Sequence, residues 1–142
     1  MLVLGGIDAS VAPETNSHII RSDDGYASVW AGAVDDLWTL GKPRGFGYVW
    51  KESDVNPGDV SDPILATGYD KKSVEIVNHG DKPIAITIQA NATDKELWID
   101  CNQTIVEPGK TFKWEFPTSL GAYWFRAKTV TPGNVSVKFV YE

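Results

Sequence analysis

The sequence predicts an all-β fold, a single antiparallel β-sandwich, and three observations carry this prediction. From about residue 72 onward, apolar residues recur at every second position, as half-buried strands require. Turn-forming runs of Gly, Pro, Asn and Asp separate these segments. No segment keeps a helical period for more than about two turns, so we expect little helix. About seven or eight short strands fit the pattern, and both jelly-roll and immunoglobulin-like connectivity remain open.

The first half of the chain is less regular than the second. "MLVLGGID" at 1–8 and "GYASVWAGAVDDLW" at 25–38 each suggest a strand, and "DDLWTL" at 35–40 is the best helical candidate. We divide the chain into residues 1–20, an N-terminal linker or edge strand, and residues 21–142, the sandwich module. Residues 41–69 are rich in Gly, Pro, Asp and Ser, so we predict a long irregular loop there, a feature that is often functional in a compact domain.

The second half contains clear period-two segments. Residues 73–88 ("SVEIVNHGDKPIAITI") read as one hairpin, and residues 104–117 ("TIVEPGKTFKWEFP") read as a second. Trp114 shares strand parity with Phe112 and Phe116, so we expect it in the core. A last strand runs from about residue 135 to the end of the sequence.

Composition excludes several classes of function. A chain of 142 residues has the length of one ordinary domain, and its formal net charge of -6 argues against nucleic-acid and membrane partners, which require basic patches. The single Cys101 excludes an internal disulfide framework and any multi-cysteine metal site. No nucleophile motif, zinc-protease motif or phosphate-binding loop is present. We therefore expect a protein that is not an enzyme on its own.

Three runs resemble a known module. "HIIRSDDGYASVWAGAVDDLWTLGKPRG", "SDPILATGYDKKSVEI" and "AYWFRAKTVTPGNVSVKFVYE" are similar to a C-terminal module of large secreted bacterial proteins, in which a β-propeller of the sialidase-repeat type precedes it. The match covers roughly residues 18–142 and is most specific at D-D-L-W-x-L-G-K-P-R-G. The resemblance implies a β-sandwich accessory domain in an extracellular polysaccharide-processing context. It supplies no binding residues.

Residues 34–50 ("VDDLWTLGKPRGFGYVW") combine the side chains that sugar binding requires. Pyranose rings stack on aromatic planes, while their hydroxyls need planar polar partners. We predict that residues 34–50, with two residues further on, form one ordered surface. The candidate ligand-binding residues are Asp35, Asp36, Trp38, Arg44, Tyr48, Trp50, Tyr69 and Asp70. The alternative is that these tryptophans close a core.

Strand parity adds two further candidates. Trp124 shares one face of its strand with Arg126 and Lys128, and Trp98 shares parity with two acidic residues, Glu96 and Asp100. Trp98 and Trp124 can therefore form an exposed platform for an extended polysaccharide. The alternative is that Trp124 is covered by the 41–69 segment or by a partner domain.

An oxygen-rich run, "DVNPGDVSDP", offers weak ligands for a structural calcium ion at Asp54, Asp59 and Asp62. Its spacing does not match the helical calcium-binding loop, and solvated turn residues are the alternative. No other cofactor is expected.

The functional expectation follows from these residues and from the resemblance. We expect a non-catalytic carbohydrate-binding accessory module of a secreted bacterial polysaccharide-processing protein, extracellular or periplasmic as part of a longer parent. Its partners are a polysaccharide or oligosaccharide and a neighbouring domain. The alternative is a structural module that packs against that neighbour, propeller or catalytic, and has no ligand of its own.

Overall fold

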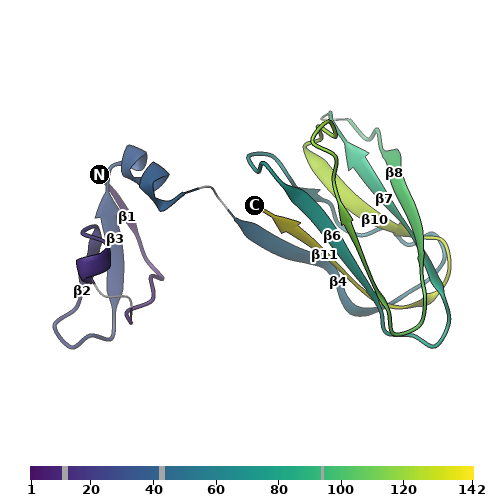
Figure 1. Cartoon of the computed structure of the whole chain (residues 1–142), viewed down its shortest axis with the longest axis horizontal. Coiled ribbons are helices and arrows are strands. Elements are labelled where there is room, and N and C mark those ends of the chain that lie inside the picture. The colour runs from purple at the N-terminus through teal and green to yellow at the C-terminus, as the bar shows by residue number, and fades with distance from the viewer. Residues whose placement is uncertain (11–12, 42–43, 94) are drawn as a thin grey trace. The chain divides into compact units, whose positions relative to one another are not determined.

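The computed structural model describes residues 1–10, 13–41, 44–93 and 95–142. The chain forms two compact units, Met1–Lys42 and Pro43–Glu142. The division made from the sequence, after residue 20, falls inside the first unit, because the segments on either side of that point pair in one small sheet. Both units are built from antiparallel strands (Figure 1).

The N-terminal unit is a three-stranded sheet in the order β1-β3-β2. Its elements are β1 (Leu2–Leu4), the 3₁₀ helix η1 (Pro13–Thr15), β2 (Ile19–Arg21), β3 (Ser28–Gly32) and the 3₁₀ helix η2 (Val34–Leu40). Trp30 and Ile19 are buried on one face. Gly32 is required beside them, because a Cβ there would lie 2.7 Å from Cη2 of Trp30 and 2.8 Å from Nδ1 of His18.

The second unit is an eight-stranded β-sandwich over the described residues, which confirms the predicted fold class. Its strands are β4 (Gly45–Val55), β5 (Ile64–Leu65), β6 (Lys72–Asn78), β7 (Ile84–Asn91), β8 (Ile99–Val106), β9 (Thr111–Glu115), β10 (Trp124–Thr129) and β11 (Gly133–Tyr141). Sheet I has the order β5-β10-β7-β8, and sheet II has the order β4-β11-β6-β9. If β4 is counted as strand 1 and β11 as strand 8, sheet I has the order 2-7-4-5 and sheet II has the order 1-8-3-6. This arrangement is the connectivity of a jelly roll.

This connectivity corrects two local predictions. Residues 73–88 and 104–117 do not form hairpins, because β6 and β7 belong to different sheets, as do β8 and β9. The turns at 78–83 and 107–110 therefore carry the chain from one sheet to the other. Asn78 ties these turns together: its Nδ2 donates to the carbonyls of Lys82 and Val106, each at 2.8 Å.

Residues 41–69, expected to be irregular, instead contain β4 and β5. β4 is eleven residues long, and two register shifts against β11 break its alternation. At one shift two residues of β4, Lys51 and Glu52, stand opposite the single Ser136 of β11, so β4 carries a bulge, and Glu52 in it has a positive φ of 48°. Because period two is interrupted within β4, sequence alternation does not reveal the strand.

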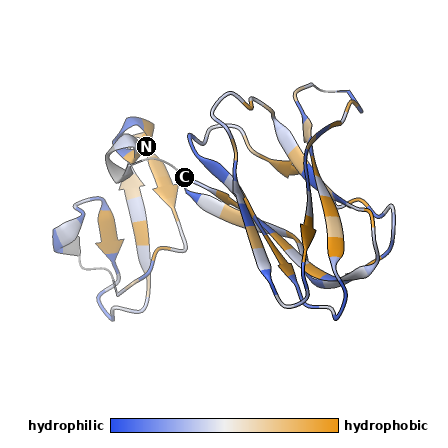
Figure 2. Cartoon of the chain, turned by 45° about the vertical axis from the view of Figure 1, so that its right-hand side comes forward, coloured by the Kyte–Doolittle hydropathy of each residue, from blue (hydrophilic) through white to orange (hydrophobic). Residues whose placement is uncertain are grey.

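The core lies between the two sheets. Phe116 packs on Phe125 with ring centroids 4.5 Å apart, and Phe139 of sheet II lies 6.2 Å from both rings. Aliphatic residues of both sheets surround this cluster, while Phe112 and Trp114 pack at its margin, as parity predicts. Figure 2 shows hydrophobic residues along the strands and hydrophilic residues at the turns. Since the inner faces are filled by the core, any ligand site of the sandwich is expected on its outer faces or ends.

Candidate functional site

The two tryptophans predicted from strand parity lie together on the outer face of sheet I. Trp98, just before β8, and Trp124, at the start of β10, line one hollow of about 190 Å³. The other lining residues are Pro63, Asn91, Thr93, Lys95 and Glu96. Trp124 is 37% exposed, so its indole presents apolar surface to solvent beside polar groups.

A row of hydrogen bonds crosses the sheet beside the tryptophans. Arg126 of β10 stands opposite Gln89 of β7, and Gln89 stands opposite Asp100 of β8. Nε of Arg126 donates to Oε1 of Gln89 at 2.8 Å, and Nε2 of Gln89 donates to Oδ1 of Asp100 at 2.7 Å. Gln89 is only 7% exposed, so both ends of a buried amide are satisfied by charged neighbours.

Arg126 also connects this row to the hollow. Its guanidinium carbon lies 3.9 Å from the ring centroid of Trp98, a close cation–π contact. Burial lowers the pKa of Arg126 from its ordinary value, and the negative charge of Glu96 opposes that shift. Arg126 therefore covers one face of Trp98, which leaves Trp124 as the better platform for a ring.

The loop that closes the hollow is fixed by Asn91. Its Nδ2 donates to the carbonyl of Lys95 at 2.6 Å, and its Oδ1 accepts from the backbone N–H of Thr93 at 2.8 Å. Asn91 is buried and stands opposite Trp124 in the β7–β10 ladder. The charged groups and the loop beside the tryptophans are thus held by hydrogen bonds that need no ligand, which is the preorganisation expected of a binding site.

Three predicted ligand residues lie in the N-terminal unit. Asp35, Asp36 and Trp38 belong to η2. Oδ2 of Asp36 accepts from the N–H of Ala33 at 2.7 Å and lies 4.0 Å from Nδ1 of His18, so this carboxylate holds the start of η2. Asp35 is exposed, and Trp38 is 78% exposed.

The rest of the 34–50 stretch belongs to the sandwich, so the single surface predicted for it is divided between two units; residues 42 and 43 lie outside the described residues. Trp50 and Tyr69 pack against the core, and Tyr69 stacks on Tyr141 at 4.8 Å. These two placements favour the core-closing alternative. Arg44 and Tyr48 are exposed.

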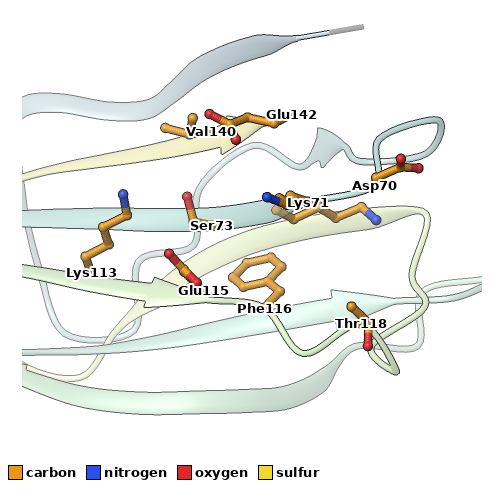
Figure 3. Close-up of a pocket in the computed structure, with 10 residues that line it drawn as sticks. Asp70, Lys71, Ser73, Lys113, Glu115, Phe116, Thr118, Val140 and Glu142 are labelled. Atoms are coloured by element: carbon orange, nitrogen blue, oxygen red, sulfur yellow. The ribbon is translucent and has the colours of Figure 1, made fainter. Parts of the chain in front are cut away.

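Asp70, the last predicted ligand residue, lies just before β6. It lines a hollow on sheet II (Figure 3).

Two of the three calcium candidates, Asp54 and Asp59, accept hydrogen bonds from neighbouring residues. Oδ1 of Asp54 accepts from Nδ2 of Asn134 at 2.9 Å, and Oδ2 of Asp59 accepts from the N–H of Asn56 at 2.7 Å. Asp62 is exposed. Within the described residues, no group of three His, Cys, Asp or Glu side chains gathers closely enough to hold a metal ion.

Sequence reasoning missed Gln89 and Asn91 as site residues and placed Arg126 and Asp100 only beside the two tryptophans. Parity could show that Arg126 shares a face with Trp124. It could not show that β10 pairs with β7, and that pairing brings Gln89 to Arg126.

Comparisons with known proteins support the fold alone. No protein-family model and no curated protein matches the sequence. Among solved structures, the chain is similar to the SPBc2 prophage-derived protein YomS, with a TM-score of 0.52, 12% identity, and coverage of 70% of this chain and 92% of that one. PirA matches with a TM-score of 0.39, 19% identity, and coverage of 69% and 91%. The Drosophila melanogaster CENP-C cupin domain matches with a TM-score of 0.29, 11% identity, and coverage of 97% and 84%. Within the part of the chain that the structure describes, no helix has the length and apolar character needed to span a bilayer.

Proposed function

We propose that this chain is a non-catalytic carbohydrate-binding module that binds a polysaccharide on the outer face of sheet I. The observation that carries the proposal is the hollow shared by Trp98 and Trp124, beside the ordered row of Arg126, Gln89 and Asp100. An open indole beside fixed donors and acceptors suits the apolar face and the hydroxyls of a pyranose. Following the resemblance in the sequence, we place the module in a secreted bacterial polysaccharide-processing protein, extracellular or periplasmic.

The proposal gives Trp124 the largest share of the binding energy. Its ring is the open platform, whereas Trp98 is already covered on one face by Arg126. By analogy with base–aromatic stacking, removing such a ring costs about 1–3 kcal/mol of binding free energy. This corresponds to a loss of affinity of roughly 5- to 150-fold.

The test compares Trp124→Ala with Ile105→Ala. Ile105 is an exposed apolar residue of β8 in the same sheet, opposite Ala85, roughly 20 Å along β7 from the position opposite Trp124. Affinity electrophoresis through gels containing β-glucan, xylan, galactomannan, starch or polygalacturonate finds the ligand, and calorimetry measures its affinity. We expect Trp124→Ala to weaken binding and Ile105→Ala to leave it unchanged. Retention by none of these polysaccharides, or equal affinities for the two variants, contradicts the proposal.

A second function, packing against a neighbouring domain, is favoured by the N-terminal sheet. Val3 stands opposite Ala31, and Ile20 stands opposite Val29, so these four aliphatic side chains share the face away from Trp30. Val3 is 54% exposed and Ile20 is 58% exposed. A sheet that leaves an apolar face open normally packs it against another layer.

This second function predicts a difference between the isolated chain and a longer parent protein. The double substitution Val3→Lys and Ile20→Lys is expected to leave the isolated chain folded but to lower the melting temperature of the longer protein. An equal effect in both contradicts packing against a neighbour.

A further inference from the structure

The outer face of sheet II carries side chains that neither proposed function uses. Outward-facing positions on its four strands bring polar, aromatic and aliphatic side chains together in adjacent rows. They are Phe46 and Tyr48 of β4, Ser136, Lys138 and Val140 of β11, Ser73, Glu75 and Val77 of β6, and Lys113 and Glu115 of β9. Two hollows lie on this face, of about 160 Å³ and 310 Å³.

The smaller hollow lies at the bulge in β4, opposite Ser136 of β11. Oγ of Ser136 accepts from the N–H of Glu52 at 2.8 Å and is hydrogen-bonded to Nε2 of His79 at 2.8 Å. Glu52 holds a positive φ of 48°, a conformation that a non-glycine residue seldom adopts. Bulges and strained backbone of this kind are concentrated at functional sites. Tyr48, which is 46% exposed, supplies an aromatic wall.

A charged row lies between the hollows. Glu75 faces Lys138 at 3.9 Å and Lys113 at 3.7 Å, so one carboxylate holds two ammonium groups on neighbouring strands. The ammonium of Lys138 also lies 4.8 Å from the ring centroid of Phe46 and 5.9 Å from that of Tyr48. The row therefore places two ammonium groups beside one carboxylate and two aromatic rings.

The larger hollow continues the same face toward the far end of β6. Figure 3 shows Ser73, Lys113 and Glu115 on neighbouring strands, with Glu142 and Thr118 at its edges. Lys113 lines this hollow and pairs with Glu75, which lines the smaller one, so the charged row runs between the two hollows. From residue 71 to residue 79 the surface extends roughly 25 Å, the length of a short oligosaccharide.

The charges of this face decide the class of ligand. The linings of the two hollows contain five lysines and five acidic side chains, so their formal charges cancel. They are Lys51, Lys71, Lys72, Lys113 and Lys138, with Glu52, Asp70, Glu75, Glu115 and Glu142. A balanced surface rich in donors and acceptors attracts neither polyanions nor polycations, but it can bond to the hydroxyls of an uncharged sugar.

We propose that the outer face of sheet II is a second saccharide-binding track, which takes an extended neutral polysaccharide from the smaller hollow to the larger one. The proposal rests on the proposed function in that it assigns the same class of ligand to a second face. Because sheets I and II turn opposite faces outward, one chain then holds two polysaccharide strands. Wild-type protein is therefore expected to cross-link and precipitate a soluble neutral polysaccharide.

The experiment uses the neutral polysaccharide that retains the wild-type chain most strongly. Tyr48→Ala removes the aromatic wall of the track, and Tyr26→Ala is its matched control, since Tyr26 is an 89% exposed tyrosine of the N-terminal unit. Glu115→Gln is a second variant, in the larger hollow. Thermal melting confirms that each variant folds. We measure retention and turbidity with each variant alone and combined with Trp124→Ala.

We expect Trp124→Ala alone to abolish turbidity while some retention remains. Adding Tyr48→Ala is then expected to lower the remaining retention at least tenfold, and adding Tyr26→Ala to change nothing. If Tyr48→Ala and Glu115→Gln behave like Tyr26→Ala in both backgrounds, the track is wrong, while any dependence on Trp124 still supports the site on sheet I. If Tyr48→Ala and Glu115→Gln lower retention but Trp124→Ala does not, the result supports the track and contradicts the site on sheet I. Stronger retention by polygalacturonate than by every neutral polymer overturns the assigned ligand class.

Discussion

Trp50→Ala is expected to destabilise the sandwich rather than to weaken ligand binding. Trp50 is half-buried and packs against the core from β4. It stands opposite Val137, which is fully buried, so its ring faces inward. Truncation of a buried tryptophan to alanine costs about 3–5 kcal/mol, and partial exposure places Trp50 near the lower end, about 3 kcal/mol.

This loss is large enough to measure without unfolding the protein. The sandwich unit, Pro43–Glu142, has the size at which 1 kcal/mol shifts the melting temperature by about 4–8 °C, so we expect a fall of roughly 12–24 °C. A domain of ordinary stability, about 5–15 kcal/mol, stays folded after such a change. Urea unfolding followed by far-ultraviolet circular dichroism gives the change in free energy directly.

Trp38→Ala is the matched control for this prediction. Its side chain is 78% exposed in the N-terminal unit, so the same chemical change there is expected to alter the free energy of unfolding by less than about 0.5 kcal/mol. A loss below about 1 kcal/mol for Trp50→Ala, together with weaker polysaccharide binding, would refute the packing argument and return Trp50 to the ligand site.

Three further predictions concern single positions. Gln89→Met removes the amide that bonds to Arg126 and Asp100, so we expect the free energy of unfolding in urea to fall by about 1–3 kcal/mol and polysaccharide binding to weaken. An unchanged affinity contradicts a positioning role for Gln89. Gly32→Ala forces a Cβ to within 2.7 Å of Trp30 and is expected to destabilise the N-terminal unit by about 1–3 kcal/mol, whereas Gly5→Ala meets nothing within 4 Å; hydrogen exchange of the Trp30 indole N–H compares them. Tyr141→Phe removes a buried hydroxyl that has no partner among the described residues, so stability at pH 7 is expected to stay equal or rise. Burial raises the pKa of Tyr141 above its ordinary value of about 10. The free energy of unfolding contributed by this group is therefore fully present below pH 10 and is lost as the pH rises above it. In urea unfolding at pH 7 to 11, the phenylalanine variant should lose less of its free energy of unfolding than the wild type.

Strand parity predicted side-chain direction well where a strand is regular. It placed Trp124 and Arg126 on one face of their strand, and both lie outward while Phe125 between them is buried, because alternation depends only on the local backbone. Parity was not applied to Trp50, because residues 41–69 were expected to be irregular, and it would have misplaced this residue: Trp50 has the same parity as Phe46 and Tyr48 but faces the core. The cause is the pair of register shifts against β11, which a reading of β4 alone cannot detect.

Strand pairing was harder to predict than strand position. The turns at 78–83 and 107–110 contain the Gly and Pro expected of hairpin turns, yet both join different sheets. What distinguishes them is Asn78, whose side chain bonds to a carbonyl in the following turn and to the distant Val106. Such a contact between remote segments has no signature in local composition. The row from Arg126 to Asp100 was missed for the same reason, since it exists only once β10, β7 and β8 lie side by side.

The six tryptophans show why composition alone could not locate a site. Trp30 is buried in the N-terminal unit, and Trp50 and Trp114 pack against the sandwich core, so half of the tryptophans have a structural role. Trp38 is widely exposed on η2. Trp98 and Trp124 line one hollow together. An indole left open in water forfeits burial worth roughly 1.5–3 kcal/mol, and at Trp124 this exposed ring adjoins polar groups already fixed by hydrogen bonds. An exposed ring beside fixed polar groups is what the proposed site requires, and Trp124 provides it on sheet I.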